Sequence, residues 1–243
     1  MLGWSGVALR YLLFIDFDNT LHDTDSKYVS RLNGLLGFDG SFLWDIFLNK
    51  IHRMVHVRFP GRHDDLRFHV ELLLEALGRR VNVEDVERFM VALEEAERAC
   101  WMDPAYFPDA LDFLRKVSGA GYILCLTTGP NSAPKARALE ERISFKVFHY
   151  VFGEDTLGCL KSEPEYYRRA LKAAGGEPSS TVTVGDTLST DIAPAKMVGL
   201  RTIWVNRKGS DPWGSRVKPD YTVKDLDEAF ERIQELFPMG CMG

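Results

Sequence analysis

An unbroken apolar run over residues 11–15, YLLFI, leads directly into Asp16 and, after one further residue, Asp18. A run without polar alternation predicts a strand buried on both faces, as in a parallel sheet. Residues two apart in a strand point to the same side, so both carboxylates can converge on one point. Carboxylates are rarely buried without a partner, and their oxygens suit a hard cation such as Mg²⁺. The feature predicts either a cation site at the end of a core strand or two solvated carboxylates.

Composition narrows the class of protein. The chain has 243 residues, of which 45% are hydrophobic and 27% charged, as in ordinary globular proteins. A net charge of −5 argues against a protein built to hold nucleic acid. No apolar stretch reaches the roughly 18 residues of a membrane span, and residues 1–13 lack the pattern of a signal peptide. The four cysteines form no CxxC pair, which fits a reducing compartment. We expect a cytoplasmic protein without membrane or nucleic-acid partners.

Two segments of the chain differ in periodicity. Residues 24–103 show helical periodicity and no convincing strand, which predicts a bundle of about four helices. Its expected features are a first helix carrying Tyr28, Leu32, Leu35 and Leu36, a second over 42–57, a third that stops at Gly78, and a fourth capped by Asn82.

From Pro108 onward, helices alternate with short apolar strands, which predicts parallel βαβ units. The expected strands cover residues 122–127, 147–152, 181–185 and 201–205. Ser162 and Asp225 are expected to cap helices as capping boxes. The predicted fold is an α/β protein with a Rossmann-like parallel sheet, helices on both faces and an inserted all-helical cap. The expected domains are residues 1–21 with 104–243 for the core, and 22–103 for the cap.

Polar residues fall where the predicted strands end. In an open parallel sheet, ligands bind beyond the carboxyl ends of the strands. Carboxylates, a lysine, hydroxyls and backbone amides together suit a metal and a phosphoryl group whose charge must be neutralised. The residues in question are Asp16, Asp18, Thr127, Thr128, Gly129, Lys161, Asp186 and Asp191.

Their order along the chain resembles the four motifs of the haloacid dehalogenase (HAD) superfamily of phosphohydrolases, over about residues 11–237. Residues 16–20, DFDNT, resemble the DxDxT motif, and Thr127 ends an apolar strand as in the second motif. Lys161 resembles the third motif, and residues 185–191, GDTLSTD, the GDxxxxD form of the fourth. Each motif alone is a weak signal, and their order and context strengthen the match.

The resemblance implies a covalent mechanism. Asp16 would attack phosphorus and form an aspartyl-phosphate. Asp18 would protonate the leaving oxygen and then accept a proton from the hydrolytic water. Mg²⁺ would be held by Asp16, by Asp18 through its backbone carbonyl, and by Asp186, with Asp191 in support through water or by orienting Lys161.

The remaining implied roles concern the phosphoryl group. Thr127 and the amides that follow it, at Thr128 and Gly129, would hold the phosphoryl oxygens, and Lys161 would neutralise developing charge. Thr128 stands where relatives often have Asn, Ser162 where Pro commonly follows the Lys, and Pro194 where Gly often sits. Proline is tolerated in a first helical turn.

The leading hypothesis is a Mg²⁺-dependent phosphomonoesterase acting on a small phosphorylated metabolite, of the sugar phosphate or nucleotide type. The helical insertion resembles the caps that close over the site in relatives, which favours a small substrate. A phosphomutase, a haloacid dehalogenase, a phosphonatase and an inactive phosphate-binding regulatory protein remain alternatives. A receiver-type signalling domain is disfavoured by motif order and length. We expect a monomer or a small homo-oligomer.

Three further patterns in the predicted cap have structural explanations. The segment from Lys50 to Arg67 is locally basic, which favours either a solvated surface or attraction of an anionic substrate. His52 and His56 have the i, i+4 spacing of a metal pair but lack a neighbouring Glu pattern. Aromatic residues at helical spacing favour a bundle core over a substrate pocket. They are Phe42, Trp44, Phe47 and Phe59.

Overall fold

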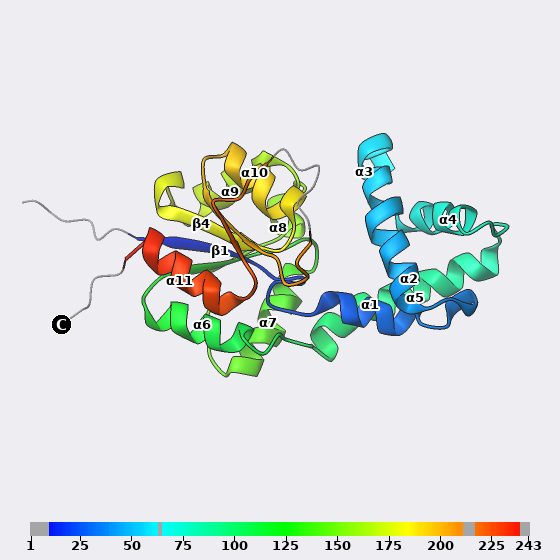
Figure 1. The fold of residues 1–243 in the computed structure, drawn as a ribbon, viewed down its shortest axis with the longest axis horizontal. Coiled ribbons are helices and arrows are strands. Elements are labelled where there is room, and N and C mark those ends of the chain that lie inside the picture. The colour runs from blue at the N-terminus through cyan, green and yellow to red at the C-terminus, as the bar shows by residue number, and fades with distance from the viewer. Residues whose placement is uncertain (1–9, 63–64, 211–216, 239–243) are drawn as a thin grey trace, which may run out of the picture. The chain divides into compact units, whose positions relative to one another are not determined.

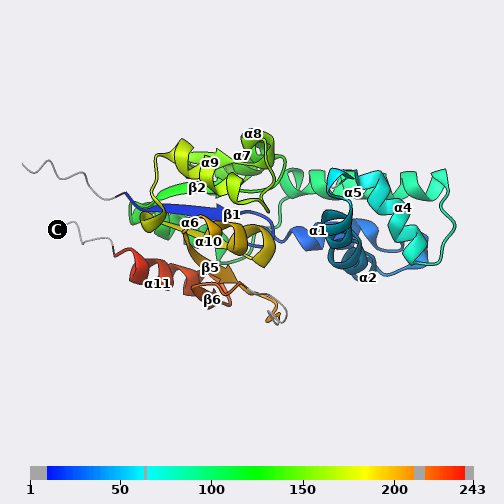
Figure 2. The ribbon, with the colours of Figure 1, turned by 90° about the horizontal axis from the view of Figure 1, so that it is seen from above.

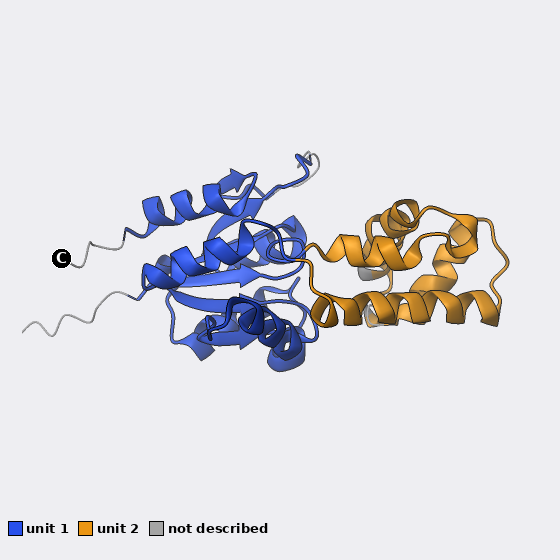
Figure 3. Cartoon of the chain, turned by 90° about the horizontal axis from the view of Figure 1, so that it is seen from below, with its two compact units in different colours: residues 1–22, 106–243 blue, residues 23–105 orange. Residues whose placement is uncertain are grey.

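The structure is a computed structural model that describes residues 10–62, 65–210 and 217–238. The chain forms two compact units (Figure 3). The core unit comprises residues 1–22 and 106–243, and the helical unit comprises residues 23–105. The sequence also predicts a loose tail over residues 238–243, and Trp204 and Trp213 beside a loop; apart from Pro238, this tail lies outside the described residues, and so does Trp213.

The core unit is built on one sheet of six parallel strands in the order β3-β2-β1-β4-β5-β6. Figure 1 labels two of these strands, β1 and β4. The strands are β1 Leu12–Asp16, β2 Ile123–Thr127, β3 Tyr150–Phe152, β4 Thr181–Gly185, β5 Arg201–Val205 and β6 Tyr221–Val223. The predicted Rossmann-like α/β fold is therefore confirmed. The sixth strand was not predicted, because it has only three residues and its place is set by pairing with β5.

Helices cover both faces of this sheet, as Figures 1 and 2 show. Alternate residues of β1 enter different cores: Leu13 and Ile15 pack on one side, Leu12 and Phe14 on the other. The first side is covered by α6 Ala110–Gly119, α7 Ser132–Ile143 and α11 Leu226–Leu236. The second side is covered by α9 Pro164–Ala174 and α10 Ala193–Met197. The short α8 Glu154–Leu157 follows β3.

A tight turn follows β1 and sets the direction of Asp18. Asn19 adopts a left-handed conformation with φ of 58°, which is tolerated by Asn better than by most residues. The amides of Leu21 and His22 both donate to the carbonyl oxygen of Phe17 at 3.0 Å, and Asn19 N donates to His22 O at 2.7 Å. The chain therefore reverses directly after the carboxyl end of the central strand.

The helical unit has its own apolar core and, among its described residues, no strand, as expected. Its longer helices are α1 Thr24–Leu32, α2 Gly40–Asp45, a π-helical segment Ile46–His52, α3 Arg53–Arg58, α4 Leu66–Ala76 and α5 Val83–Met102. The expected second helix thus contains a π-helical segment. The expectation that Leu35 and Leu36 continue the first helix is wrong, because they lie in a 3₁₀ turn, Leu35–Gly37, where Leu36 has φ of 52°.

The predicted helix ends were partly right. Asn82 caps α5 through a hydrogen bond from Asp85 N at 2.9 Å, and Gly78 has the positive φ, 69°, of a C-terminal cap. Ser162 does not cap α9: Pro164 begins that helix and Glu163 precedes it without a side-chain cap. Proline suits the first helical position because it lacks an N–H and has a fixed φ, so the start shifts past Ser162.

The other patterns of the helical unit also have an outcome. Phe47 is buried and Trp44 packs against the same core, whereas Phe42 and Phe59 are exposed. His52 Nδ1 lies 3.2 Å from Nε2 of the buried His69. The side chain of the other predicted pair member, His56, lies outside what the structure describes.

Candidate active site

The carboxyl ends of three adjacent strands bring the predicted residues together. Asp16 is the last residue of β1 and pairs in register with Thr127, the last residue of β2. On the other side of β1, β4 ends at Gly185, and Asp186 follows it. The three strands end at one edge because the sheet is parallel, and this edge is where ligands bind in such folds.

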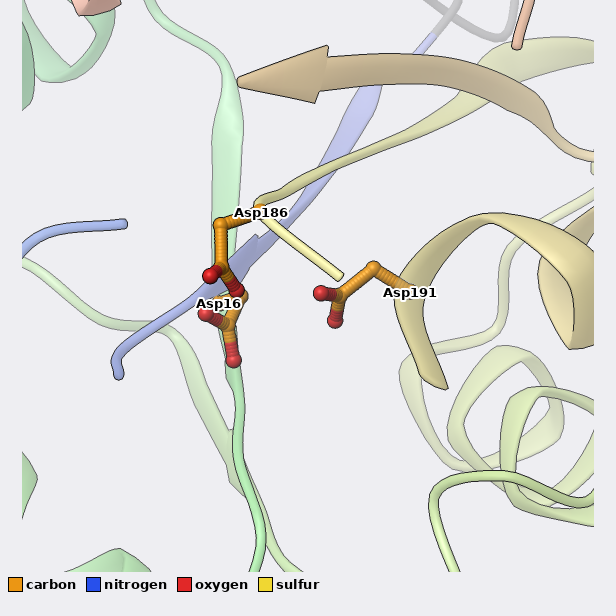
Figure 4. A group of neighbouring side chains, drawn as sticks. All are labelled: Asp16, Asp186 and Asp191. Carbon is orange, nitrogen blue, oxygen red and sulfur yellow. The ribbon is translucent and has the colours of Figure 1, made fainter. Parts of the chain in front are cut away.

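Three carboxylates form an acidic group at this edge (Figure 4). Side-chain oxygen atoms of Asp16, Asp186 and Asp191 lie within 4.8 Å of one another. Thr187 N donates to Asp191 Oδ2 at 2.9 Å and fixes that side chain. A Cβ atom at Gly185 would lie 2.3 Å from Asp191 Cγ, so the close approach of Asp191 to the end of β4 requires glycine at this position.

Burial and mutual repulsion make Asp16 and Asp186 hard to ionise without a compensating charge. Burial, together with the charges of Asp191 and Asp18, raises the pKa of Asp16 to about 7 despite the lowering effect of Lys161. The pKa of Asp186 is also raised well above its usual range, first by burial and then by Asp16 and Asp191. A carboxylate group of this kind is typical of functional sites.

Lys161 lies between two members of the acidic group. Its Nζ atom is 2.5 Å from Asp16 Oδ1 and 2.6 Å from Asp191 Oδ1, and its side chain is only 6% exposed. Burial alone would lower the pKa of Lys161, but Asp16 and Asp191 raise it well above its usual range. Lys161 N donates to Glu154 Oε1 at 2.8 Å, which connects the lysine backbone to α8. The lysine is therefore a fixed positive charge beside Asp16.

The end of β2 and the segment after it contain the other expected donors. The Thr127 hydroxyl is buried and has no hydrogen-bond partner within the described chain. Thr128 donates its hydroxyl to Asp18 Oδ2 at 3.2 Å and its amide to Phe152 O at 3.0 Å. The carbonyl oxygen of Gly129 accepts from Glu154 N at 3.2 Å. Thr127 is thus positioned for an outside acceptor, whereas both of these Thr128 donors already have protein acceptors.

One charged residue of the site was missed by the sequence analysis. Lys135, near the start of α7, is 2% exposed, and its Nζ lies 2.8 Å from Asp18 Oδ2. A signal for it existed: Lys135, Leu139 and Ile143 are spaced by four residues, so the lysine continues the buried stripe of α7. A lysine at an otherwise apolar position predicts a buried anionic partner.

The donor set fits a divalent cation. The site contains four carboxylates, at residues 16, 18, 186 and 191, and two lysines. When all six groups are ionised, two negative charges remain uncompensated. Asp16 Oδ2 is buried and accepts no hydrogen bond from the part of the chain that the structure describes. Asp191 Oδ1 is near Lys161 Nζ but outside hydrogen-bonding geometry. Carboxylate oxygens are the ligands that Mg²⁺ prefers, so the acidic group could hold this ion.

Comparison with known proteins gives a consistent result. Residues 12–199 match the family model described as haloacid dehalogenase-like hydrolase. The chain is 33% identical to the phosphoserine phosphatase of Thermus thermophilus over 173 residues, which cover 65% of this chain and 68% of that protein. It is 26% identical to the glyceraldehyde 3-phosphate phosphatase of Pyrococcus furiosus over 237 residues, 92% of each chain.

A solved structure has the same fold. The HAD-hydrolase YfnB from Bacillus subtilis, determined with bound magnesium, matches with a TM-score of 0.70 and 19% identity, covering 92% of this chain and 99% of that chain. No helix among the described residues is long and apolar enough to cross a membrane.

Proposed function

The chain belongs to the haloacid dehalogenase-like hydrolase family, and we propose that it is a Mg²⁺-dependent phosphomonoesterase that forms an aspartyl-phosphate on Asp16. Its substrate is a small phosphorylated metabolite, of the sugar phosphate or nucleotide type. The observation that carries the proposal is the group of three carboxylates, two of them buried, with Lys161 beside Asp16. The names of the two similar phosphatases, whose substrates are small phosphate monoesters, support the reaction class.

In the proposed mechanism, Asp16 is the nucleophile. Lys161 binds Asp16 Oδ1 at 2.5 Å, so Oδ1 is oriented, and the developing charge on the phosphoryl oxygens is neutralised at short range. The Thr127 hydroxyl, which lacks a protein acceptor among the described residues, donates to a phosphoryl oxygen. Asp18 gives a proton to the leaving oxygen and later removes one from water.

The metal would be held by Asp16, Asp186 and the backbone carbonyl of Asp18, with Asp191 in support. When bound there, Mg²⁺ lowers the repulsion between an anionic nucleophile and an anionic substrate. The same positive charge favours the ionised form of Asp16, whose pKa is otherwise raised by burial.

The helical unit is proposed to act as a cap domain that limits which substrates enter. We place the enzyme in the cytosol as a monomer or small homo-oligomer. In support, the three described cysteines are free thiols, two of them buried. They are Cys100, Cys125 and Cys159.

A haloacid dehalogenase is disfavoured by the site itself. That reaction requires no acid for a leaving oxygen and no metal, yet Asp18 and the acidic group are present. A phosphomutase would use the same groups and is separated from a phosphatase by the product: a mutase returns the phosphoryl group to an organic hydroxyl, whereas a phosphatase releases inorganic phosphate.

The first experiment measures hydrolysis of p-nitrophenyl phosphate by the wild type, with Mg²⁺ and with EDTA, and by Asp16→Asn. Asp112→Asn is the matched control, since its carboxylate is 69% exposed and pairs with Arg115 on the surface of α6. We expect turnover that requires Mg²⁺, is lost in Asp16→Asn and is retained in Asp112→Asn. Release of inorganic phosphate from phosphoserine and glyceraldehyde 3-phosphate then tests the substrate class.

A folded wild type that hydrolyses no phosphate monoester would overturn the proposed function. Turnover that survives in Asp16→Asn at the wild-type rate would overturn the assignment of the nucleophile. Turnover that persists unchanged in EDTA would overturn the requirement for the metal.

A further inference from the structure

We propose that Lys135 is a positioning residue for Asp18, which it holds so that one defined carboxylate oxygen exchanges protons with the leaving group and with water. The inference rests on the proposed function, because it concerns how the acid and base of that reaction is oriented. Asp18 lies in the turn after β1, and Lys135 lies near the start of α7.

Two donors bind the same oxygen of Asp18. Lys135 Nζ lies 2.8 Å from Oδ2, and the Thr128 hydroxyl donates to Oδ2 at 3.2 Å. The Lys135 side chain is 2% exposed, whereas the Asp18 side chain is 30% exposed. The ammonium group is therefore inside the protein, and the carboxylate it holds reaches the side from which a substrate can approach.

The position of the ammonium group is itself fixed. At the start of α7, Ser132 Oγ donates to Asp155 Oδ2 at 3.2 Å, which anchors the helix to α8. The Lys135 ammonium also lies 5.6 Å from the centre of the Phe17 ring, within the range of a cation–π contact. Lys135 thus approaches Asp18 from a helix that is anchored close to the lysine.

Stability alone does not explain a buried lysine here. Removing an ammonium group from water costs several kcal/mol, and a buried ion pair is often no more stable than apolar residues of similar size. Leu139 and Ile143 occupy the next positions of the same helical stripe and are buried without charge. An apolar side chain at position 135 would fit that stripe but could not make the contact with Asp18.

The contact fixes the orientation of the Asp18 carboxylate. Because the ammonium group and the hydroxyl both bind Oδ2, we assign the exchange of protons to the other oxygen, Oδ1. In the first step, the bond between phosphorus and the leaving oxygen breaks, Asp16 bonds to phosphorus, and the Oδ1 proton moves to the leaving oxygen. In the second step, water bonds to phosphorus, its proton moves to Oδ1, and the bond to Asp16 breaks.

The test compares kcat/KM for two aryl phosphates of similar shape. Phenol is a poorer leaving group than p-nitrophenol and depends more on a proton donor. We expect Lys135→Met to lower kcat/KM for phenyl phosphate about tenfold more than for p-nitrophenyl phosphate. Inhibition by inorganic phosphate should be unchanged, because the proposed role of Lys135 concerns Asp18 and not the residues that hold the phosphoryl oxygens. Lys116→Met is the matched control, since Lys116 is 47% exposed and pairs with Asp227 on the surface.

A second variant keeps the test valid if Lys135→Met does not fold. Thr128→Val removes the other donor to Oδ2 and should change the ratio of the two kcat/KM values in the same direction. Equal fold losses of kcat/KM for both substrates, in whichever variant folds, would leave the ratio unchanged. This result would show a merely structural role and overturn the proposal, as would no loss for either substrate. A wild type inactive on both substrates would overturn the proposed function instead, and this inference with it.

Discussion

Replacing Asp16, the proposed nucleophile, should stabilise the metal-free protein. Asp16→Asn keeps the size of the side chain but removes a negative charge that is 4% exposed and surrounded by other carboxylates. The sign follows from the raised pKa. Because the folded chain holds the Asp16 proton more tightly than the unfolded chain does, ionising Asp16 costs stability as the pH rises from its ordinary pKa toward the raised one.

The size of the effect follows from the same shift. Burial raises the pKa of Asp16 from 3.8 to about 7, and each unit corresponds to about 1.4 kcal/mol. At pH 8 the carboxylate is ionised in both states, so its cost reaches roughly 4 kcal/mol. At pH 5 the folded protein still holds the proton and the cost falls to roughly 2 kcal/mol. We therefore expect Asp16→Asn to gain stability at both pH values, and more at pH 8.

Urea denaturation in EDTA at both pH values measures this difference as the free energy of unfolding. Asp112→Asn serves as the control, since an exposed surface substitution should change stability by no more than about 0.5 kcal/mol. An Asp16→Asn variant that is no more stable than the wild type at pH 8 would refute the reasoning. A gain that is the same at both pH values would show that the cause is not ionisation.

Three further predictions concern the groups around Asp16. Millimolar Mg²⁺ should raise the Tm of the wild type more at pH 8 than at pH 6, because protons compete for Asp16 and Asp186, whose pKa values are raised; equal shifts in a thermal-melting assay would contradict this. Lys161→Met should lower the free energy of unfolding in EDTA by about 3–5 kcal/mol, since it leaves a buried ion pair broken; a near-native urea midpoint would count against it. Gly185→Ala should weaken Mg²⁺ binding, measured by calorimetry, and lower the free energy of unfolding by about 1–3 kcal/mol, because its Cβ would overlap Asp191; Gly119→Ala, whose Cβ would meet nothing within 4 Å, should leave Mg²⁺ binding unchanged and should not destabilise the fold.

The sequence predicted the regular elements of the core unit well where local signals were strong. Strands β4 and β5 have the predicted limits, because each is a short apolar run bounded by turns. In the helical unit, the helix cap at Asn82 was also predictable, because a cap is a contact between residues within four positions of each other. Ser162 shows the limit of such signals: a proline two residues later moved the start of the helix.

The missed elements depend on contacts between distant residues. Strand β6 exists because three residues pair with β5, and no local pattern marks so short a strand. In the site, the candidate residues from the four motifs could be predicted, because each lies at or just after the end of a predicted strand or close to the start of a helix. The link between Lys135 and Asp18 joins positions more than a hundred residues apart, and only the stripe of α7 hinted at it.

The position of β1 has a consequence for how the chain is made. This central strand pairs with β2 and β4, and both of these emerge from the ribosome after the whole helical unit. The helical unit has a core of its own, formed by residues close in sequence, and such local contacts form early. Protease digestion of nascent chains arrested at increasing lengths should show the helical unit protected before β1. Asp16 is synthesised before the helical unit and Asp186 after it, so the acidic group cannot form until β4 has also been synthesised.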